Sequence, residues 1–244
     1  MLFITGLAAG FVDSIAGGGG LITIPVLLSF GLEPATALGT NKLQATFGSG
    51  SAAAHYAWAK AVSLTECAQG FVYTLMGAGI GAVVVQRVDP TFLRRAIPVL
   101  LIGVAVYFLC KPKLGAEDRH PRMGRGWFDL LFGLGLGFYD GFFGPGTGTF
   151  WAMSCVLVLG FNLTRATAHT KVMNFASNLS SLAFFLAGGK VLFAMGLIMG
   201  VGQLLGARMG SRMVITRGTT LIRPVFLVVV IALTVKLLYD SYRA

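Results

Sequence analysis

The chain is a succession of long apolar blocks separated by short polar loops. Only 11% of its 244 residues are charged, against about 25% in a typical soluble domain. Such a chain cannot cover a water-facing surface, and repeated apolar blocks of this length predict an all-α polytopic membrane protein. The 34 glycines fit that class, because small residues let helices approach closely in lipid.

The net charge of +10 could indicate a nucleic-acid partner, but the positions of the cations favour another interpretation. They cluster at the ends of apolar blocks, where Lys and Arg set the orientation of membrane spans. We therefore expect a lipid bilayer and no nucleic acid as partner. The two clusters are Lys111, Lys113, Arg119, Arg122 and Arg125, and Arg208, Arg212, Arg217 and Arg223.

Two motifs from the first half of the chain recur in the second half. The stretch "GFVDSIAGGGG" at 10–20 recurs as "GFYDGFFGPGT" at 137–147, and "GLEPATALGTNKLQ" at 31–44 recurs as "GFNLTRATAHTKVM" at 160–173. Internal repeats are typical of secondary transporters, with the binding site where the halves meet. The predicted organisation is a first repeat at 1–110, a polar cytoplasmic linker at 111–126 and a second repeat at 127–244.

Each half is predicted to contain a glycine-broken segment and three further apolar stretches. The first broken segment, 2–30, is too long for one span, which needs about 20 residues. Its second arm, 21–30, would reach only about 15 Å as a helix. This favours a re-entrant hairpin with Gly17–Gly20 at its tip. The apolar stretches are expected at 43–58, 65–86 and 93–110, and, after the broken segment 127–160, at 172–187, 190–210 and 221–239.

Three full spans per half would make the two repeats inverted in topology. On that model the Lys and Arg residues are more numerous on the side of the central linker, which places the linker in the cytoplasm and both termini outside. If both arms of each hairpin span the membrane, the chain has eight spans and its orientation stays undecided.

Two glycine-rich runs, 16–21 and 144–149, interrupt apolar segments. Non-helical backbone at membrane depth persists only where it is buried in protein or lines a wet cavity. A half-helix that starts after each run would aim free N–H groups at the cavity, which suits an anion. The substrate-binding candidates here are Gly18, Gly19, Gly20, Gly146 and Thr147. The alternative is that the glycines only allow close helix crossing.

An aspartate precedes each glycine run, and both lie within apolar segments. A buried carboxylate can carry a proton, so Asp13 and Asp140 are candidates for proton coupling. Each could instead accept backbone N–H bonds as a helix cap. The sequence leaves these two roles open.

Each half also contains a lysine among hydroxyl and carboxamide residues, in "GTNKLQATFGSGS" and "HTKVMNFASNLSS". Cations, hydroxyls and amides that face a cavity are the groups that bind a small oxyanion. The alternative is that both lysines extend to the membrane surface and anchor helix ends; His169 could equally be a capping residue. The candidates are Thr40, Asn41, Lys42, Gln44, His169, Thr170, Lys171, Asn174 and Asn178.

Other chemistries find little support in the sequence. The three cysteines lie far apart, and the three histidines are scattered without an HExxH or GxSxG context, so no metal, cofactor or enzymatic activity is expected. A transporter of a cation or neutral solute that uses the aspartates remains the alternative function. A homodimer also remains open.

The motifs "GFVDSIAGGGGLITIP", "ATALGTNKLQATF", "GFYDGFFGPGTGTF", "HTKVMNFASNLSSL" and "GGKVLFAMGLIMGVGQLLGARMGSRMV" together resemble the TauE/SafE family of membrane permeases, also called the 4-toluenesulfonate uptake family. The resemblance implies a two-repeat helical fold in the bacterial inner membrane and export of small sulfur-containing anions such as sulfite or organosulfonates. It also suggests proton-linked transport. We therefore expect a multi-pass exporter of such an anion that works by alternating access.

Overall fold

The computed structural model describes residues 1–93, 95–97, 99 and 118–218, and their regular structure is helical throughout. This confirms the all-α class. The predicted stretches 93–110 and 221–239 lie largely or wholly outside these residues. The helices are α1 (Leu2–Ala16), α2 (Gly19–Ser29), α3 (Pro34–Trp58), α4 (Leu64–Val85), α6 (Arg125–Phe142), α7 (Thr147–Leu157), α8 (Leu163–Ala187) and α9 (Phe193–Arg217).

The helices α3 and α8 begin nine residues earlier than the predicted stretches 43–58 and 172–187. Pro34 occupies the first position of α3, where its missing N–H costs nothing. Asn162 caps α8 by accepting a hydrogen bond from the Arg165 amide at 3.0 Å. The polar residues around Lys42 and Lys171 lower the local hydropathy, so in the sequence they look like the ends of apolar stretches. In the structure they lie inside two 25-residue helices.

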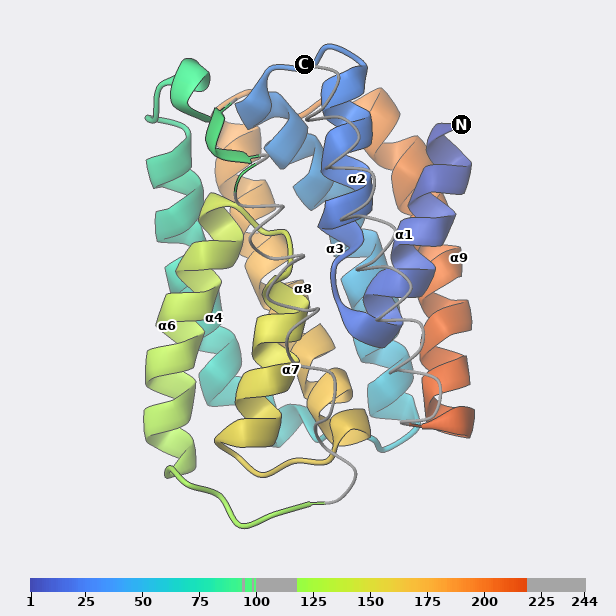
Figure 1. The fold of residues 1–244 in the computed structure, drawn as a ribbon, viewed down its shortest axis with the longest axis vertical. Coiled ribbons are helices and arrows are strands. Elements are labelled where there is room, and N and C mark those ends of the chain that lie inside the picture. Colours follow the sequence, from blue (N-terminus) through green and yellow to red (C-terminus); the bar gives the residue numbers. More distant parts are fainter. Residues whose placement is uncertain (94, 98, 100–117, 219–244) are drawn as a thin grey trace.

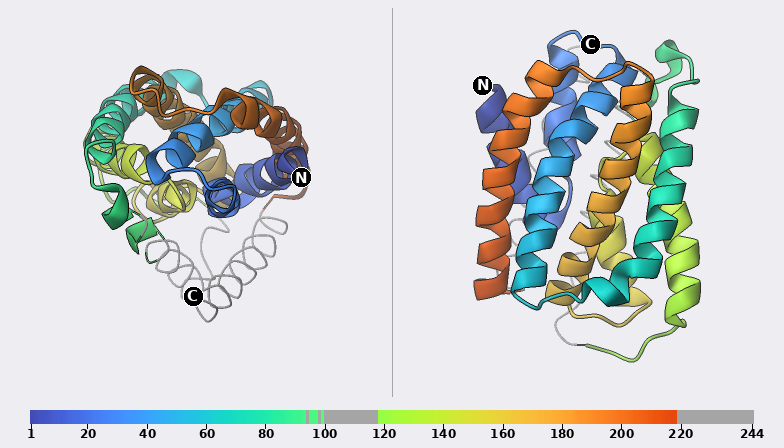
Figure 2. Two further views of the ribbon diagram at one scale, coloured as in Figure 1. Left: turned by 90° about the horizontal axis from the view of Figure 1, so that it is seen from above. Right: turned by 180° about the vertical axis from the view of Figure 1, so that it is seen from behind.

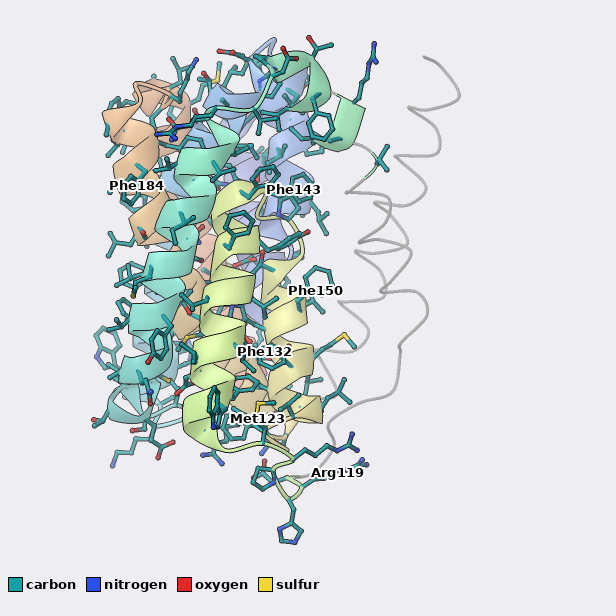
Figure 3. The ribbon with its side chains drawn as sticks, turned by 90° about the vertical axis from the view of Figure 1, so that its left-hand side faces the viewer. Arg119, Met123, Phe132, Phe143, Phe150 and Phe184 are labelled. Atoms are coloured by element: carbon teal, nitrogen blue, oxygen red, sulfur yellow. The ribbon has the colours of Figure 1, made fainter. Side chains whose placement is uncertain are left out.

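Two of the helices, α4 and α9, are both long and apolar enough to cross a membrane. At 25 residues, α3 and α8 are also long enough, at about 38 Å, but their polar residues face inward. Apolar side chains cover the outside of the bundle, and Figure 3 shows Phe184 of α8 pointing outward. Other exposed apolar residues are Val72, Met76 and Ile80 on α4, and Val201, Leu205 and Met209 on α9.

The two broken segments enter the bundle from opposite ends (Figure 1). In the first, α1 descends from the N-terminal end and α2 returns to it. In the second, α6 rises from the other end and α7 returns to that end. The long helices α3 and α8 lie side by side at the back of the molecule, flanked by α9 and α4 (Figure 2). Two hairpins therefore meet in the middle of the bundle.

Each hairpin packs through its first arm on a helix from the other half of the chain: α1 on α9, and α6 on α4. Glycines allow these crossings. A Cβ added at Gly206 would collide with the Leu7 carbonyl oxygen, and one added at Gly141 would collide with that of Ala78. For these glycines, which lie outside the two runs, close crossing is the role that the structure supports.

Candidate functional site

The site lies where the tips of the two hairpins touch. Gly17 and Gly18 separate α1 from α2 with φ of 72° and 115°, values that favour glycine. Gly19 and Gly20 belong to the first turn of α2, so the predicted tip, Gly17–Gly20, is too long by two residues. Two residues are enough to connect the two arms of the hairpin, because the positive φ angles of Gly17 and Gly18 reverse the direction of the chain.

The second break contains Gly144 and Gly146, with φ of 95° and 83°. The Thr149 hydroxyl in the first turn of α7 donates to the Ala16 carbonyl oxygen at 2.8 Å. A Cβ on Gly17 would stand only 2.7 Å from the Gly148 carbonyl carbon. The second hairpin thus binds the C-terminal end of α1 directly.

The first buried ion pair connects Lys42 of α3 with Asp140 of α6. The lysine is 1% exposed, and its Nζ donates to Asp140 Oδ1 at 2.7 Å and to the Asp140 backbone oxygen at 2.5 Å. The other carboxylate oxygen, Oδ2, accepts a hydrogen bond from the Ser177 hydroxyl. Asp140 is therefore held by one residue from each of the two central helices.

The second buried ion pair connects Lys171 of α8 with Asp13 of α1. Lys171 is fully buried, and its Nζ lies 3.0 Å from Asp13 Oδ2. The other oxygen, Oδ1, accepts hydrogen bonds from the Gly18 and Gly19 amides at 3.1 and 3.0 Å. Asp13 therefore does what the capping alternative describes, and it also pairs with a lysine.

Both ion pairs cross from one half of the chain to the other. The alternative that the lysines anchor helix ends at the membrane surface is wrong, because both ammonium groups are buried. Charges out of water persist when they are paired and hydrogen-bonded, and removal of one partner from such a pair typically costs 3–5 kcal/mol. The pairs therefore hold the hairpins against the central helices.

A small, partly open cavity lies between the breaks, with a volume of about 30 Å³. A cavity of this size holds about two water molecules, at about 10–15 Å³ each on this measure. The lining residues are Asp13, Gly18, Gly20, Asn41, Ala45, Asp140, Gly144, Gly146, Thr147, Gly148, Asn174, Asn178 and Gln203.

Seven of the predicted substrate-binding residues do not line this cavity: Gly19, Thr40, Lys42, Gln44, His169, Thr170 and Lys171. Lys42 and Lys171 adjoin it through the aspartates that they bind. The Thr40 hydroxyl accepts a hydrogen bond from the Leu192 amide at 2.9 Å, next to the start of α9. The Thr170 hydroxyl donates to the Ala166 carbonyl of its own helix at 2.7 Å. Gln44 acts indirectly, because its Nε2 donates to Asn41 Oδ1 at 2.7 Å.

His169 lies inside α8, so the prediction that it stands at a helix start is wrong. Its Nε2 is 3.1 Å from Arg125 Nη2, and its Nδ1 is 3.5 Å from Cys155 Sγ. The helix begins earlier, at Leu163, because Asn162 provides the cap. His169 thus belongs to a cluster at the beginning of α6 and does not line the cavity.

Two polar residues in or beside the site were missed by the sequence analysis. Ser177, which binds Asp140, is three residues after Asn174, so helical spacing from that candidate would have found it. Gln203 lines the cavity from α9. It is an isolated carboxamide in an apolar helix, and a polar side chain in a membrane span is itself a signal of function.

In the part of the chain that the structure describes, no three His, Cys, Asp or Glu side chains are grouped as metal ligands would be. The site offers two ion pairs, several carboxamides and the ends of two half-helices. Broken helices that meet at mid-bundle around buried charges are the arrangement found in membrane transporters.

Comparison with known proteins agrees with that class: the chain belongs to the sulfite exporter TauE/SafE family, whose model matches residues 2–237. It is 50% identical over 242 residues to the "Probable membrane transporter protein YfcA" of Escherichia coli strain K12, covering 99% of this chain and 90% of that relative.

Two further relatives carry similar names. A "Probable membrane transporter protein" of Haemophilus influenzae is 48% identical over 241 residues, covering 99% of this chain and 94% of the relative. The "Probable membrane transporter protein ORF9" of a Sinorhizobium species is 46% identical over 239 residues, covering 98% and 92%. No solved structure matches the chain. Membership of this family and the names of these relatives identify the protein as a membrane transporter and not an enzyme.

Proposed function

We propose that the protein exports a small sulfur-containing anion, sulfite or an organosulfonate, across the bacterial inner membrane by alternating access. The family name supports the substrate class. The chemistry of the site supports an anion, because carboxamides and helix N-termini surround the cavity and both carboxylates are already paired with lysines. In the described residues the aspartates therefore offer no free charge to a cation.

The two halves act as inverted repeats in this proposal. Their hairpins enter from opposite ends (Figure 1), and the recurring motifs lie on corresponding elements: α1 and α6, then α3 and α8. The contacts correspond as well, since α1 packs on α9 as α6 packs on α4. Rocking of such repeats about a central site would expose it alternately to each side.

The observation that carries the proposal is the crosswise pairing of Lys42 with Asp140 and of Lys171 with Asp13. An anion that enters the site competes with a carboxylate for the lysine ammonium group. When a lysine turns to the anion, Asp13 keeps its two amide donors and Asp140 keeps the Ser177 hydroxyl. Each carboxylate thus keeps at least one hydrogen bond from the protein, while the ion pair that connects the two halves is broken.

The membrane potential supplies a driving force for export. Lys and Arg favour the cytoplasmic side, and the described cations are most numerous at the end where α3 ends and α4, α6 and α8 begin. Arg119 lies at this end of the bundle (Figure 3). With this end inside, an interior-negative potential drives a monovalent anion outward by about 2.3 kcal/mol per 100 mV. Proton coupling through Asp13 or Asp140 is an additional hypothesis.

Flux from proteoliposomes tests the function. Vesicles loaded with ³⁵S-sulfite should lose label when a potassium diffusion potential makes the interior negative, and unlabelled sulfonates should compete. Transport of cations or neutral solutes, with no anion flux, would contradict the proposal. A pH gradient imposed at a clamped membrane potential distinguishes proton-linked transport from transport driven by the potential alone, because only proton-linked flux responds to the gradient.

Two variants examine the exchange of partners in the same assay. Lys42→Ala should abolish sulfite flux, because both the anion and Asp140 lose their cation. Asp13→Asn leaves Lys171 in place and keeps an oxygen that can accept the Gly18 and Gly19 amides. This variant should retain anion flux. If Asp13 carries the coupled proton, the flux should no longer respond to the pH gradient. Intact sulfite flux in Lys42→Ala would remove this lysine from the site.

A further inference from the structure

We infer that the anion binds at only one of the two helix breaks, the N-terminus of α7, and that Asp13 already occupies the corresponding place on α2. This inference rests on the proposed function and makes its site specific. The two breaks are alike in sequence position and in their glycine conformations, but they differ in which hydrogen-bond donors remain available.

At α2 the aspartate occupies the helix N-terminus. Asp13 Oδ1 accepts the amides of Gly18 and Gly19, which are two of the first three N–H groups at this end. A carboxylate is the kind of anion that a helix N-terminus binds. A second anion at this place would face the Asp13 charge and would find only the Gly20 amide.

At α7 the equivalent aspartate is turned away. Asp140 binds Lys42 and Ser177 and accepts no bond from the first turn of α7. The Thr147 amide donates to the Gly144 carbonyl at 3.2 Å. The amides of Gly146 and Gly148 have no acceptor within residues 1–93 and 118–218, and both residues line the cavity. This N-terminus is therefore open to a ligand.

An unpartnered carboxamide provides independent evidence at the same place. Asn174 is 5% exposed and lines the cavity, and its carboxamide has no hydrogen-bond partner among the described residues. Oδ1 is an acceptor left without a donor, and Nδ2 is the donor that an anion would bind. A Cβ added at Gly148 would stand 3.0 Å from Asn174 Nδ2, so this donor faces the first turn of α7. On the α2 side the carboxamide of Asn41 is held in place, because its Oδ1 accepts bonds from Thr23 at 2.6 Å and from Gln44 at 2.7 Å.

Both lysines also lie near the second break and the start of α7. A Cβ added at Gly144 would stand 3.3 Å from Lys42 Nζ, and one at Gly148 would stand 3.4 Å from Lys171 Nζ. At Gly18, the only atoms within 4 Å of such an atom belong to Leu21, and no ammonium group is among them. Amides, a carboxamide and two ammonium groups therefore lie around the second break. These groups suit the head group that sulfite and sulfonates share, three oxygens on one sulfur. We therefore expect one anion to bind per chain.

A crystal structure of the protein with bromomethanesulfonate tests the location directly, because bromine scatters anomalously and the sulfonate presents three oxygens. We expect these oxygens within hydrogen-bond distance of the Gly146 and Gly148 amides and of Asn174. Binding at Gly18–Gly20 would overturn the inference and leave the proposed function standing. If neither this anion nor ³⁵S-sulfite binds the wild-type protein, both fail.

A matched pair of variants tests the inference in solution. Equilibrium dialysis of the wild-type protein should find one ³⁵S-sulfite per chain. Asn174→Asp places a negative charge at the proposed subsite and should weaken binding about 100-fold, whereas Asn41→Asp, on the α2 side, should weaken it less than about tenfold. The reverse order, or two sulfites per chain, would contradict the single subsite. If Asn174→Asp does not purify as a monodisperse protein, Asn174→Ala replaces it, with an expected loss of about tenfold.

Discussion

Lys42 and Lys171 occupy equivalent positions in the two halves, but the structure holds them differently. Lys42 contacts the Asp140 carboxylate and backbone and lies 3.4 Å from Asn178 Oδ1. Among the described residues, Lys171 Nζ has one hydrogen-bond partner, Asp13 Oδ2. Their partners differ too, because Asp13 also accepts two amides whereas Asp140 also accepts one hydroxyl. Loss of each lysine should therefore have a different cost.

Lys42→Ala should destabilise the protein by about 3–5 kcal/mol, because Asp140 would remain buried with only Ser177 as a donor. Lys171→Ala should cost less, since two backbone amides still stabilise Asp13. Reversible unfolding in mixed detergent micelles measures both. The double variant Lys42→Ala/Asp140→Ala removes the orphaned charge and should recover part of the loss. Equal losses in the two single variants would contradict this account.

At the scale of elements, hydrogen bonds and glycine contacts decide how the broken helices sit. Only one side-chain bond joins the two tips in the described residues, from Thr149 to the carbonyl at the end of α1. The crossing of α1 and α9 depends on glycines on both helices, with Gly206 against the Leu7 carbonyl. Each of these features can be tested against a similar residue elsewhere in the bundle.

Thr149→Val should destabilise the protein by about 1–3 kcal/mol, because the Ala16 carbonyl would be buried without its donor. Thr46→Val is the matched control. The Thr46 hydroxyl donates to the Lys42 carbonyl within the same helix at 2.8 Å, where the helical backbone still provides a partner. Unfolding of both variants in micelles should show a clear loss for the first only. Similar losses would mean that the contact between tips contributes nothing specific.

Gly206→Ala should cost about 1–3 kcal/mol, because the added methyl group collides with backbone that cannot move without separating α1 from α9. Gly135→Ala on α6 is the control, since nothing lies within 4 Å of a Cβ at that position. It should stay within about 1 kcal/mol of the wild type, the range of helix propensity between glycine and alanine. The thermal midpoint of each purified variant checks this, and a stable Gly206→Ala would argue against the packing.

At the scale of the whole molecule, the two halves are interlocked. The hairpin of each half packs on a helix of the other, α1 on α9 and α6 on α4, and both buried ion pairs cross between them. The predicted boundaries, 1–110 and 127–244, remain a division of the sequence into repeats. In the structure, helices from each half pack against the hairpin of the other half.

Neither half should therefore fold alone. Expressed separately, 1–110 and 127–244 should aggregate or be degraded. Each fragment would expose the glycine-lined helix faces that pack on the other half, and its lysine and aspartate would lose their ion-pair partners. Co-expressed, the two fragments should copurify and bind ³⁵S-sulfite. Size-exclusion chromatography in detergent checks both statements. A monodisperse first half on its own would contradict the interlocked arrangement.

Much of this architecture can be predicted from local sequence. Hydropathy indicated an all-helical membrane protein, and the glycine runs marked both breaks. Lys42, Lys171 and the two aspartates were predicted as site residues, and the structure places them in two buried ion pairs beside the breaks. Helix starts were less accurate, because hydropathy falls at the polar clusters whereas α3 and α8 continue through them. His169 was misplaced for the same reason.

The sequence by itself determined the membrane class, the places where helices break and the residue types near the breaks, because these depend on local hydropathy and on glycine conformation. Only the tertiary structure decided the partners. Pairing of each lysine with the aspartate of the other half, and the different orientations of Asp13 and Asp140, depend on contacts between residues about a hundred or more positions apart. Two similar local motifs can therefore differ in function, because their surroundings come from different parts of the chain.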